Sequence, residues 1–236
     1  MSSRILLSEI DWLSVTADLN QNGYAYISDV LSKEVCNELI GAYENPDLYR
    51  KIVVMERHRF GLGEYKYFDY PLLSIVQQLR EDLYSHIRAV ANLWQGVLKL
   101  GSQFPDTHEQ WIEYCHSQGQ IEATPLILKY GKGGFNTLHQ DMYGEVYFPL
   151  QAAFFLNDPN TDYQGGEFVL TEQVPRAQSK VMVLKPDRGA VVIFASNFRP
   201  IKGSRGYYRA TMRHGVSEVR SGNRHTLGII FHDALK

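Results

Sequence analysis

The second half of the chain is a succession of short strand-like runs with no helical pattern between them, and this feature limits the fold most. After Gln120, runs rich in β-branched and aromatic residues recur between Gly, Pro, Asn and Asp. The predicted strands cover residues 124–130, 136–140, 146–156, 166–171, 180–184, 190–195, 207–212, 214–219 and 226–232. Strands that follow one another without helices pair in antiparallel fashion, so we expect a barrel or a two-sheet sandwich.

The first half of the chain shows the apolar spacing of helices. Helices are predicted over residues 8–19, 32–43, 71–97 and 107–118, with one short strand over 23–28. In the first helix apolar residues occupy two faces, and the sequence leaves open which face is buried. Residues 55–70 show neither period and are predicted to form an ordered loop. With no linker or repeat, we expect a single domain over 1–236, in which 1–120 is mainly helical support and 121–236 is the β core.

Composition and apolar runs exclude several classes of protein. A hydrophobic fraction of 44% is too high for a disordered chain. The apolar run at 190–195 is far shorter than the roughly 20 residues of a membrane span, so no membrane partner is expected. Cys36 and Cys115 are far apart and in no metal-binding spacing, so we do not expect a disulfide framework. This cysteine usage favours a cytoplasmic location.

A basic segment interrupts an otherwise acidic chain. Residues 197–225 hold seven Lys and Arg and a single Glu, which gives a local charge of +6, whereas the rest of the chain carries −8. Such a segment is either a solvated face or a wall that binds anions, and the sequence leaves both interpretations open.

His139-Gln140-Asp141 is the feature most indicative of chemistry. Residues two apart on a strand point to the same face, so His139 and Asp141 can face one point. His214 follows 75 residues later, also at the end of a predicted strand, and a rolled-up sheet can bring the two together. Two histidines and one carboxylate leave about three positions of a metal ion open, which is typical of non-haem Fe(II) oxygenases, whereas structural zinc needs four ligands.

Arg224 lies ten residues after His214. The planar fork of an arginine side chain can hold a carboxylate through two parallel hydrogen bonds. An arginine on the strand next to the third candidate metal ligand therefore suits a dicarboxylate cosubstrate.

These motifs together resemble a known family. The HQD at 139–141, the RHG at 213–215 and the GNR at 222–224 are similar to the Fe(II)/2-oxoglutarate-dependent dioxygenase superfamily, and within it to the prolyl-hydroxylase-like branch. Longer strings resemble a bacterial 2-oxoglutarate/Fe(II) oxygenase subfamily of unassigned substrate: GEYKYFDYPL (63–72), LHQDMYGEVYFPLQ (138–151), GGEFVLTEQVPRAQSK (165–180) and RHGVSEVRSGNRHTLGIIFHDA (213–234). The resemblance implies an α+β fold, with a double-stranded β-helix (jelly-roll, cupin-like) core in the C-terminal half and N-terminal helices packed against it.

The resemblance also implies roles for individual residues. It implies three catalytic residues that bind Fe(II), namely His139, Asp141 and His214. Arg224 is then the anchor of the distal carboxylate of 2-oxoglutarate, with Tyr130 and Thr226 lining the same cosubstrate pocket. The alternative for Tyr130 is an ordinary half-buried strand aromatic without such a role. The other six histidines, which have no partner at ligand spacing, are expected to be structural or exposed.

The implied activity is that of a dioxygenase, an oxidoreductase that hydroxylates a C–H bond with dioxygen while 2-oxoglutarate is decarboxylated to succinate. Three interpretations of the primary substrate or role stay open. The spacing like that of prolyl hydroxylases favours a protein or amino-acid side chain. The first alternative is oxidative dealkylation of damaged nucleic-acid bases, against which the net charge of −2 counts. The second is a non-catalytic β-barrel binding protein, against which the intact ligand set counts.

Candidate substrate contacts come from two segments. Alternation within 207–213 places Arg209 and Arg213 on one face of a strand. Tyr65 and Tyr67 lie in the predicted loop at 55–70, which is either a lid over the site or a segment packed under the barrel edge. The sequence does not define the oligomeric state.

Overall fold

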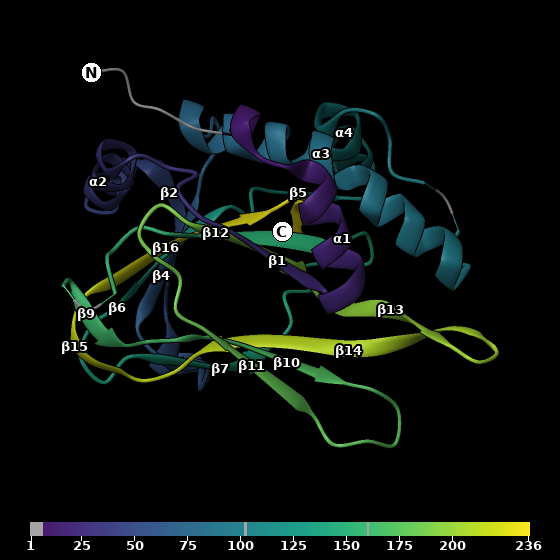
Figure 1. Cartoon of the computed structure of the whole chain (residues 1–236). Coiled ribbons are helices and arrows are strands. Elements are labelled where there is room, and N and C mark those ends of the chain that lie inside the picture. The colour runs from purple at the N-terminus through teal and green to yellow at the C-terminus, as the bar shows by residue number, and fades with distance from the viewer. Residues whose placement is uncertain (1–6, 102, 160) are drawn as a thin grey trace.

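The computed structural model describes residues 7–101, 103–159 and 161–236, and it consists of two facing antiparallel sheets with helices on one outer side (Figure 1). The seven-stranded sheet has the order β1 (Tyr24–Ile27), β12 (Val191–Ala195), β8 (Leu150–Phe155), β16 (Arg224–Ile230), β6 (Leu126–Tyr130), β4 (Glu64–Phe68) and β2 (Tyr49–Val54). The six-stranded sheet has the order β11 (Lys180–Leu184), β10 (Phe168–Gln173), β14 (Gly206–Val216), β7 (Phe135–His139) and β3 (Gly61–Leu62), with β13 (Phe198–Gly203) also paired to β14. Neighbours in each sheet are mostly distant in sequence, so the expected α+β fold with a jelly-roll core is confirmed.

The remaining elements close the ends and one side of the sandwich. Two short strand pairs are β9 (Tyr163–Gly165) with β15 (Val219–Gly222) and β5 (Gln120–Glu122) with β17 (Ala234–Leu235). The helices are α1 (Trp12–Asn22), α2 (Lys33–Ala42), α3 (Ser74–Leu98) and α4 (His108–Ser117), and single turns are η1 (Leu7–Glu9), η2 (Pro46–Leu48) and η3 (Met55–His58). No helix among the described residues is long and apolar enough to cross a membrane.

The helices lie where their apolar spacing predicts. In α3 the residues at spacings of three and four are buried against the large sheet, including Leu79, Leu83 and Ile87. In α1 the structure decides between the two faces, because Val15 and Leu19 are buried while Leu13 is 85% exposed. Asp11 caps α1 by accepting hydrogen bonds from the backbone N–H groups of residues 13 and 14, so this helix begins later than predicted.

The prediction of a loop over residues 55–70 is wrong. This segment holds η3, β3 and β4, and β4 is an inner strand of the large sheet between β2 and β6. Its Tyr65 and Tyr67 alternate with charged residues, so the period of a strand is present, but the strand spans only five residues and the pattern is easily missed. The first half of the chain therefore contributes strands as well as helices to the fold.

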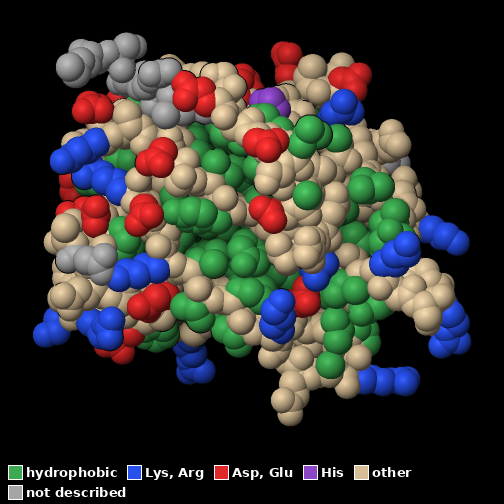
Figure 2. Space-filling view, in the orientation of Figure 1, with side chains coloured by type: hydrophobic (Ala, Val, Ile, Leu, Met, Phe, Trp, Pro, Cys, Tyr) green, Lys and Arg blue, Asp and Glu red, His purple; other side chains and the backbone are tan. Residues whose placement is uncertain are grey.

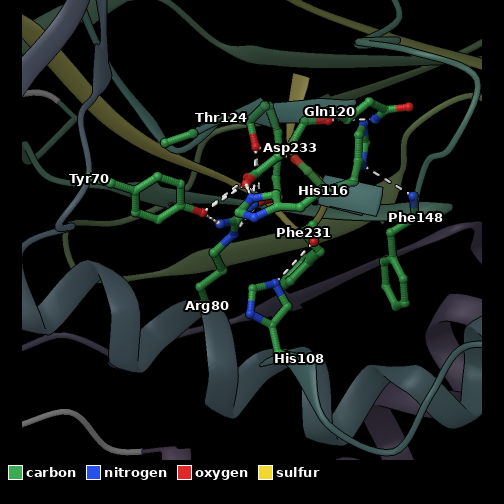
Figure 3. A network of polar contacts seen from close by, with 12 residues as sticks. Tyr70, Arg80, His108, His116, Gln120, Thr124, Phe148, Phe231 and Asp233 are labelled. Atoms are coloured by element: carbon green, nitrogen blue, oxygen red, sulfur yellow. Dashed lines mark hydrogen bonds and ion pairs between the residues drawn. The ribbon is translucent and has the colours of Figure 1, made fainter. Parts of the chain in front are cut away.

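A buried charged network fixes the C-terminal segment to the helical layer (Figure 3). Arg80 of α3 and Asp233 are both fully buried and form an ion pair of 2.8 Å. Arg80 also donates to the carbonyl of Ile230 at 2.8 Å and to the phenol of Tyr70 at 2.9 Å, while His116 contacts the second oxygen of Asp233 at 2.8 Å. Each of the three nitrogen atoms of the guanidinium thus donates to a partner. A buried ion pair is tolerated when its remaining donors are satisfied in this way.

Removing Arg80 should destabilise the fold strongly. We expect Arg80→Met to lower the free energy of unfolding by about 3 to 5 kcal/mol, because the buried Asp233 carboxylate loses its ion-pair partner Arg80 and keeps only its contacts with Tyr70 and His116. Arg88→Met is the matched control, since Arg88 on the same helix pairs at 2.8 Å with an exposed Asp106, and its loss should cost at most about 1 kcal/mol. Urea denaturation measures both, and equal losses would contradict the account.

Because two histidines are buried, we expect the free energy of unfolding to decrease as the pH is lowered. Burial and the nearby charge of Arg80 lower the pKa of His108 to about 3, and burial lowers the pKa of His232 to about 3 as well. In the unfolded chain both groups bind a proton near pH 6.5, so the unfolded state binds more protons below that pH. The free energy of unfolding should therefore fall from about pH 6.5 downward, by about 1.4 kcal/mol per pH unit and per histidine. A free energy of unfolding that is unchanged between pH 7 and pH 5 would refute this expectation.

Candidate active site

The pairing of two strands brings the candidate metal ligands together. His139 is the last residue of β7, and the register of the antiparallel pair places it directly opposite His214 of β14. Asp141 follows two residues after His139 and lies on the same side. Its carboxylate oxygens are 3.6 Å from Nε2 of His139 and 3.3 Å from Nε2 of His214. The three ligand atoms lie within 4.8 Å of one another, a spacing at which one metal ion can contact all three.

Neighbouring contacts orient the two side chains of the HQD motif that flank the site. Nδ1 of His139 donates to the carbonyl of Thr137 at 2.7 Å, so Nε2 is the ring nitrogen that faces Asp141. Gln140 points to the other side of the strand and donates to the carbonyls of Asn197 and Met212 at 2.7 and 2.8 Å. The motif is thereby held from both sides.

The electrostatics of the three side chains suit a cation. Burial raises the pKa of the Asp141 carboxyl. The opposing effects of His214, His139 and a hydrogen bond from Tyr143 are larger together, so the resulting pKa lies well below the ordinary range. Burial and the neighbouring His139 lower the pKa of His214. The shifts of Asp141 and His214 favour an ionised carboxylate and a neutral imidazole, which are the forms of these two side chains that bind a metal.

Arg224 is a buried cation that forms no ion pair with a carboxylate of the described residues. It is 1% exposed at the start of β16, and one Nη donates to Oγ1 of Thr226 at 2.8 Å. Its Nε and its other Nη have no hydrogen-bond partner among the described residues. Tyr130 of β6 is the register partner of Arg224, and the centre of its ring lies 5.5 Å from the guanidinium carbon. A buried charge left unpaired costs several kcal/mol, and the free donors of Arg224 have the geometry that binds a carboxylate.

A cavity of about 260 Å³ connects these two groups of residues. It lies between the two sheets and reaches from the His139, Asp141 and His214 side chains to Arg224, Thr226 and Tyr130. Its remaining walls are largely apolar and aromatic: Tyr65, Tyr67, Leu126, Leu128, Phe168 and Phe194. A mostly apolar cavity with a few convergent polar groups is the usual form of a small-molecule site.

The candidate substrate residues divide into two groups. Tyr65 and Tyr67 line the cavity as strand residues, whereas Arg209 and Arg213 do not line it. Both arginines are exposed on the outer face of β14, on the same side as predicted from alternation, and the Arg209 guanidinium lies 4.6 Å from the ring centre of Phe198. The basic segment is thus of mixed character, because Arg199 is buried against Glu172 and Arg224 faces the cavity.

The other six histidines have structural contacts in the described part of the chain, as expected. Two of them stack on aromatic rings, His86 on Trp12 and His58 on Phe60. Four form hydrogen bonds: His108 with Phe231, His116 with Asp233, His225 with Asn157 and His232 with Phe148.

Two residues of the site were not predicted from the sequence. Tyr143 donates a hydrogen bond of 3.0 Å to Oδ1 of Asp141, and Asn136 donates one of 3.3 Å to the phenol of Tyr130. A signal for Tyr143 was available, because it lies two positions after Asp141. No comparable signal marks Asn136, which reaches Tyr130 only because the turn at residues 131–134 folds β7 back over β6.

Comparison with known proteins agrees with this geometry. A family model described as "Oxygenase, catalysing oxidative methylation of damaged DNA" matches residues 63–234. An uncharacterized protein found in two strains of Mycobacterium tuberculosis is 44% identical over 167 residues, which are 71% of this chain and 72% of that protein.

Solved structures share the fold at low sequence identity. A prolyl-4-hydroxylase from Pseudomonas putida aligns with a TM-score of 0.57 at 16% identity, covering 93% of this chain and 97% of that one. A 2-oxoglutarate/Fe(II) oxygenase family oxidoreductase from Burkholderia pseudomallei aligns with a TM-score of 0.54 at 16% identity, covering 97% and 95%. These likenesses establish the jelly-roll fold, and the match over residues 63–234 establishes the family. The chain belongs to the oxygenase family whose model describes action on damaged DNA.

Proposed function

We propose that this oxygenase depends on Fe(II) and 2-oxoglutarate. The observation that carries the proposal is the presence, in one cavity, of a two-histidine, one-carboxylate cluster and a buried arginine without an anion. The donor set fits ferrous iron, since three ligands on one side leave open positions, and the cluster holds no thiolate that would favour zinc.

Each group in the cavity then has a defined task. His139, Asp141 and His214 hold the metal ion, and Arg224 binds the distal carboxylate of 2-oxoglutarate with its free Nε and Nη groups. Thr226 fixes the orientation of that guanidinium. Ferrous iron with 2-oxoglutarate supplies the activation of dioxygen, in which the cosubstrate loses carbon dioxide to become succinate and a substrate C–H bond is hydroxylated. The apolar walls exclude water from the reacting groups.

We propose a damaged base of DNA as the primary substrate. The matching family model carries this description. Aromatic walls at Tyr65, Tyr67 and Phe194 offer faces for a planar base. On an N-methylated base, hydroxylation of the methyl carbon gives a hemiaminal, which releases formaldehyde and restores the N–H group.

The exposed hairpin of β13 and β14 is the proposed contact with the phosphate backbone. It projects from the body of the molecule, and Lys and Arg side chains lie over it (Figures 1 and 2). Lys202, Arg205 and Arg213 are exposed and form no ion pair among the described residues. Because β14 runs from this hairpin to His214, bound DNA would extend along the strand that leads to the cavity.

A protein side chain is the second candidate substrate, and the net charge of −2 is the observation that favours it. Prolyl hydroxylases share the fold, but at identities too low to transfer a substrate. The DNA experiments below distinguish the two candidates.

Arg224 should control affinity for the cosubstrate. In Mn(II)-loaded protein without oxygen, we expect Arg224→Gln to weaken 2-oxoglutarate binding by about 10- to 100-fold, because two charge-assisted hydrogen bonds are lost. Arg220→Gln removes an equal charge from the exposed strand β15 and should leave the affinity unchanged. Isothermal titration calorimetry measures both, and similar affinities for the two variants would remove Arg224 from the cosubstrate site.

Turnover should require the carboxylate ligand. With Fe(II), ascorbate and methylated single-stranded DNA, wild-type protein should release formaldehyde and succinate, and Asp141→Ala should release neither. Formaldehyde from the Asp141→Ala variant at the wild-type rate would contradict the assignment of the ligand. Succinate without formaldehyde, or no stimulation by DNA, would favour a protein substrate.

DNA binding should be sensitive to salt through the hairpin. We expect the double variant Lys202→Ala, Arg205→Ala to weaken binding of single-stranded DNA and to reduce the slope of log affinity against log salt by about 1 to 2, because two phosphate contacts are lost. Lys51→Ala, an exposed lysine on strand β2 of the other sheet, is the control. Fluorescence anisotropy at several salt concentrations measures the slopes, and identical slopes would exclude the hairpin as the DNA contact.

A further inference from the structure

Two tyrosines outside the ligand set form a hydrogen-bonded chain that ends on the candidate iron ligand. Tyr67 of β4 donates to the phenol of Tyr143 at 3.0 Å, and Tyr143 donates to Oδ1 of Asp141 at 3.0 Å. The direction of the chain is fixed by chemistry. An ionised carboxylate only accepts hydrogen bonds, so the hydroxyl of Tyr143 donates its hydrogen bond to Asp141 and accepts one from Tyr67.

Asp141 needs such support because the sheet does not hold it. It lies beyond the last residue of β7, at the start of the irregular segment that continues to β8. His139 has its own support in the carbonyl of Thr137. The ring of His214 is packed beside Phe194 at 4.8 Å between ring centres, while its Nδ1 has no partner among the described residues. The phenol of Tyr143 is therefore the one side-chain group outside the ligand set that holds Asp141 by a hydrogen bond in the described residues.

Tyr143 is itself held on several sides. Its ring contacts that of Tyr67 edge to face at 6.1 Å and that of the fully buried His232 at 6.0 Å. Its carbonyl accepts a hydrogen bond of 3.1 Å from the backbone N–H of Leu235 in the C-terminal strand. A side chain fixed in this way can hold a carboxylate in one orientation without losing further conformational entropy when metal binds.

We propose that Tyr143 is a positioning residue for the metal site, which occupies Oδ1 of Asp141 so that Oδ2 is presented to the metal, and that Tyr67 orients Tyr143. The proposal rests on the proposed function, in that it takes Asp141 as a metal ligand. It assigns to β4 a part in metal binding, although β4 supplies no ligand.

Metal binding without turnover tests the proposal. In the absence of oxygen and 2-oxoglutarate, Tyr143→Phe should weaken Co(II) binding by about tenfold, the size seen when outer partners of metal ligands are removed. It should also change the visible absorption of bound Co(II), because the carboxylate is free to rotate or to bind through both oxygens. Tyr67→Phe should weaken binding by about threefold, the loss of one neutral hydrogen bond. The double variant should bind no more weakly than Tyr143→Phe alone, since Tyr67 acts only through Tyr143.

Tyr147→Phe is the matched control. Tyr147 lies in the same segment and its ring is 6.4 Å from that of His232, but it makes no contact with Asp141 in the described residues. Calorimetry and absorption titration should give wild-type values for this variant. Melting temperatures of all variants show whether a loss of affinity reflects unfolding, and the remote Tyr67→Phe variant tests the chain even where Tyr143→Phe is unstable.

Each outcome decides between the proposals. Wild-type affinity and an unchanged Co(II) spectrum in folded Tyr143→Phe would overturn the positioning role while leaving the metal site intact. Additive losses in the double variant would overturn the link through Tyr67. Failure of wild-type protein to bind Co(II) would instead overturn the proposed function on which this inference rests.

Discussion

The antiparallel register of β7 with β14 is the constraint on which the rest of the site depends. It places His139 opposite His214 and carries Asp141 to the same point two residues later. A shift of the register by one residue would turn the ligands of one strand to the opposite face of the sheet. The packing that fixes this register therefore also brings the three candidate metal ligands together, and Gln140 reinforces the register by donating to the backbone carbonyl of Met212.

The second constraint is electrostatic. The fold buries two arginines completely, and it treats them differently. Arg80 forms an ion pair with Asp233, and each nitrogen of its guanidinium donates a hydrogen bond, so it stabilises the attachment of the C-terminal segment. Arg224 keeps free donors in the wall of a cavity and forms no ion pair with a carboxylate in the part of the chain that the structure describes. A buried guanidinium left unpaired is costly, and this is the basis on which we propose an anionic ligand for Arg224.

Much of this arrangement could be predicted from the sequence. Strand alternation placed His139 and Asp141 on one face, and that rule needs no tertiary information. His214 and Arg224 were indicated by their spacing and by the resemblance of the RHG and GNR motifs to a known family. The role of β4 was missed because its alternation is only five residues long, and its place as an inner strand depends on pairing with the distant strand β6 as well as with β2. The Arg80–Asp233 pair spans 153 residues of sequence, and local pattern carries no information about such a contact. The Tyr67–Tyr143 bond was hidden for the same reason.

The central claim is that one cavity binds iron through the cluster and 2-oxoglutarate through Arg224. Its most direct test is an absorption titration of metal-free wild-type protein without oxygen, first with Fe(II) and then with 2-oxoglutarate. The account predicts a visible charge-transfer band that appears only when both are present and that is absent from His139→Ala. Folded wild-type protein that binds Fe(II) and 2-oxoglutarate without such a band, or not at all, would contradict it.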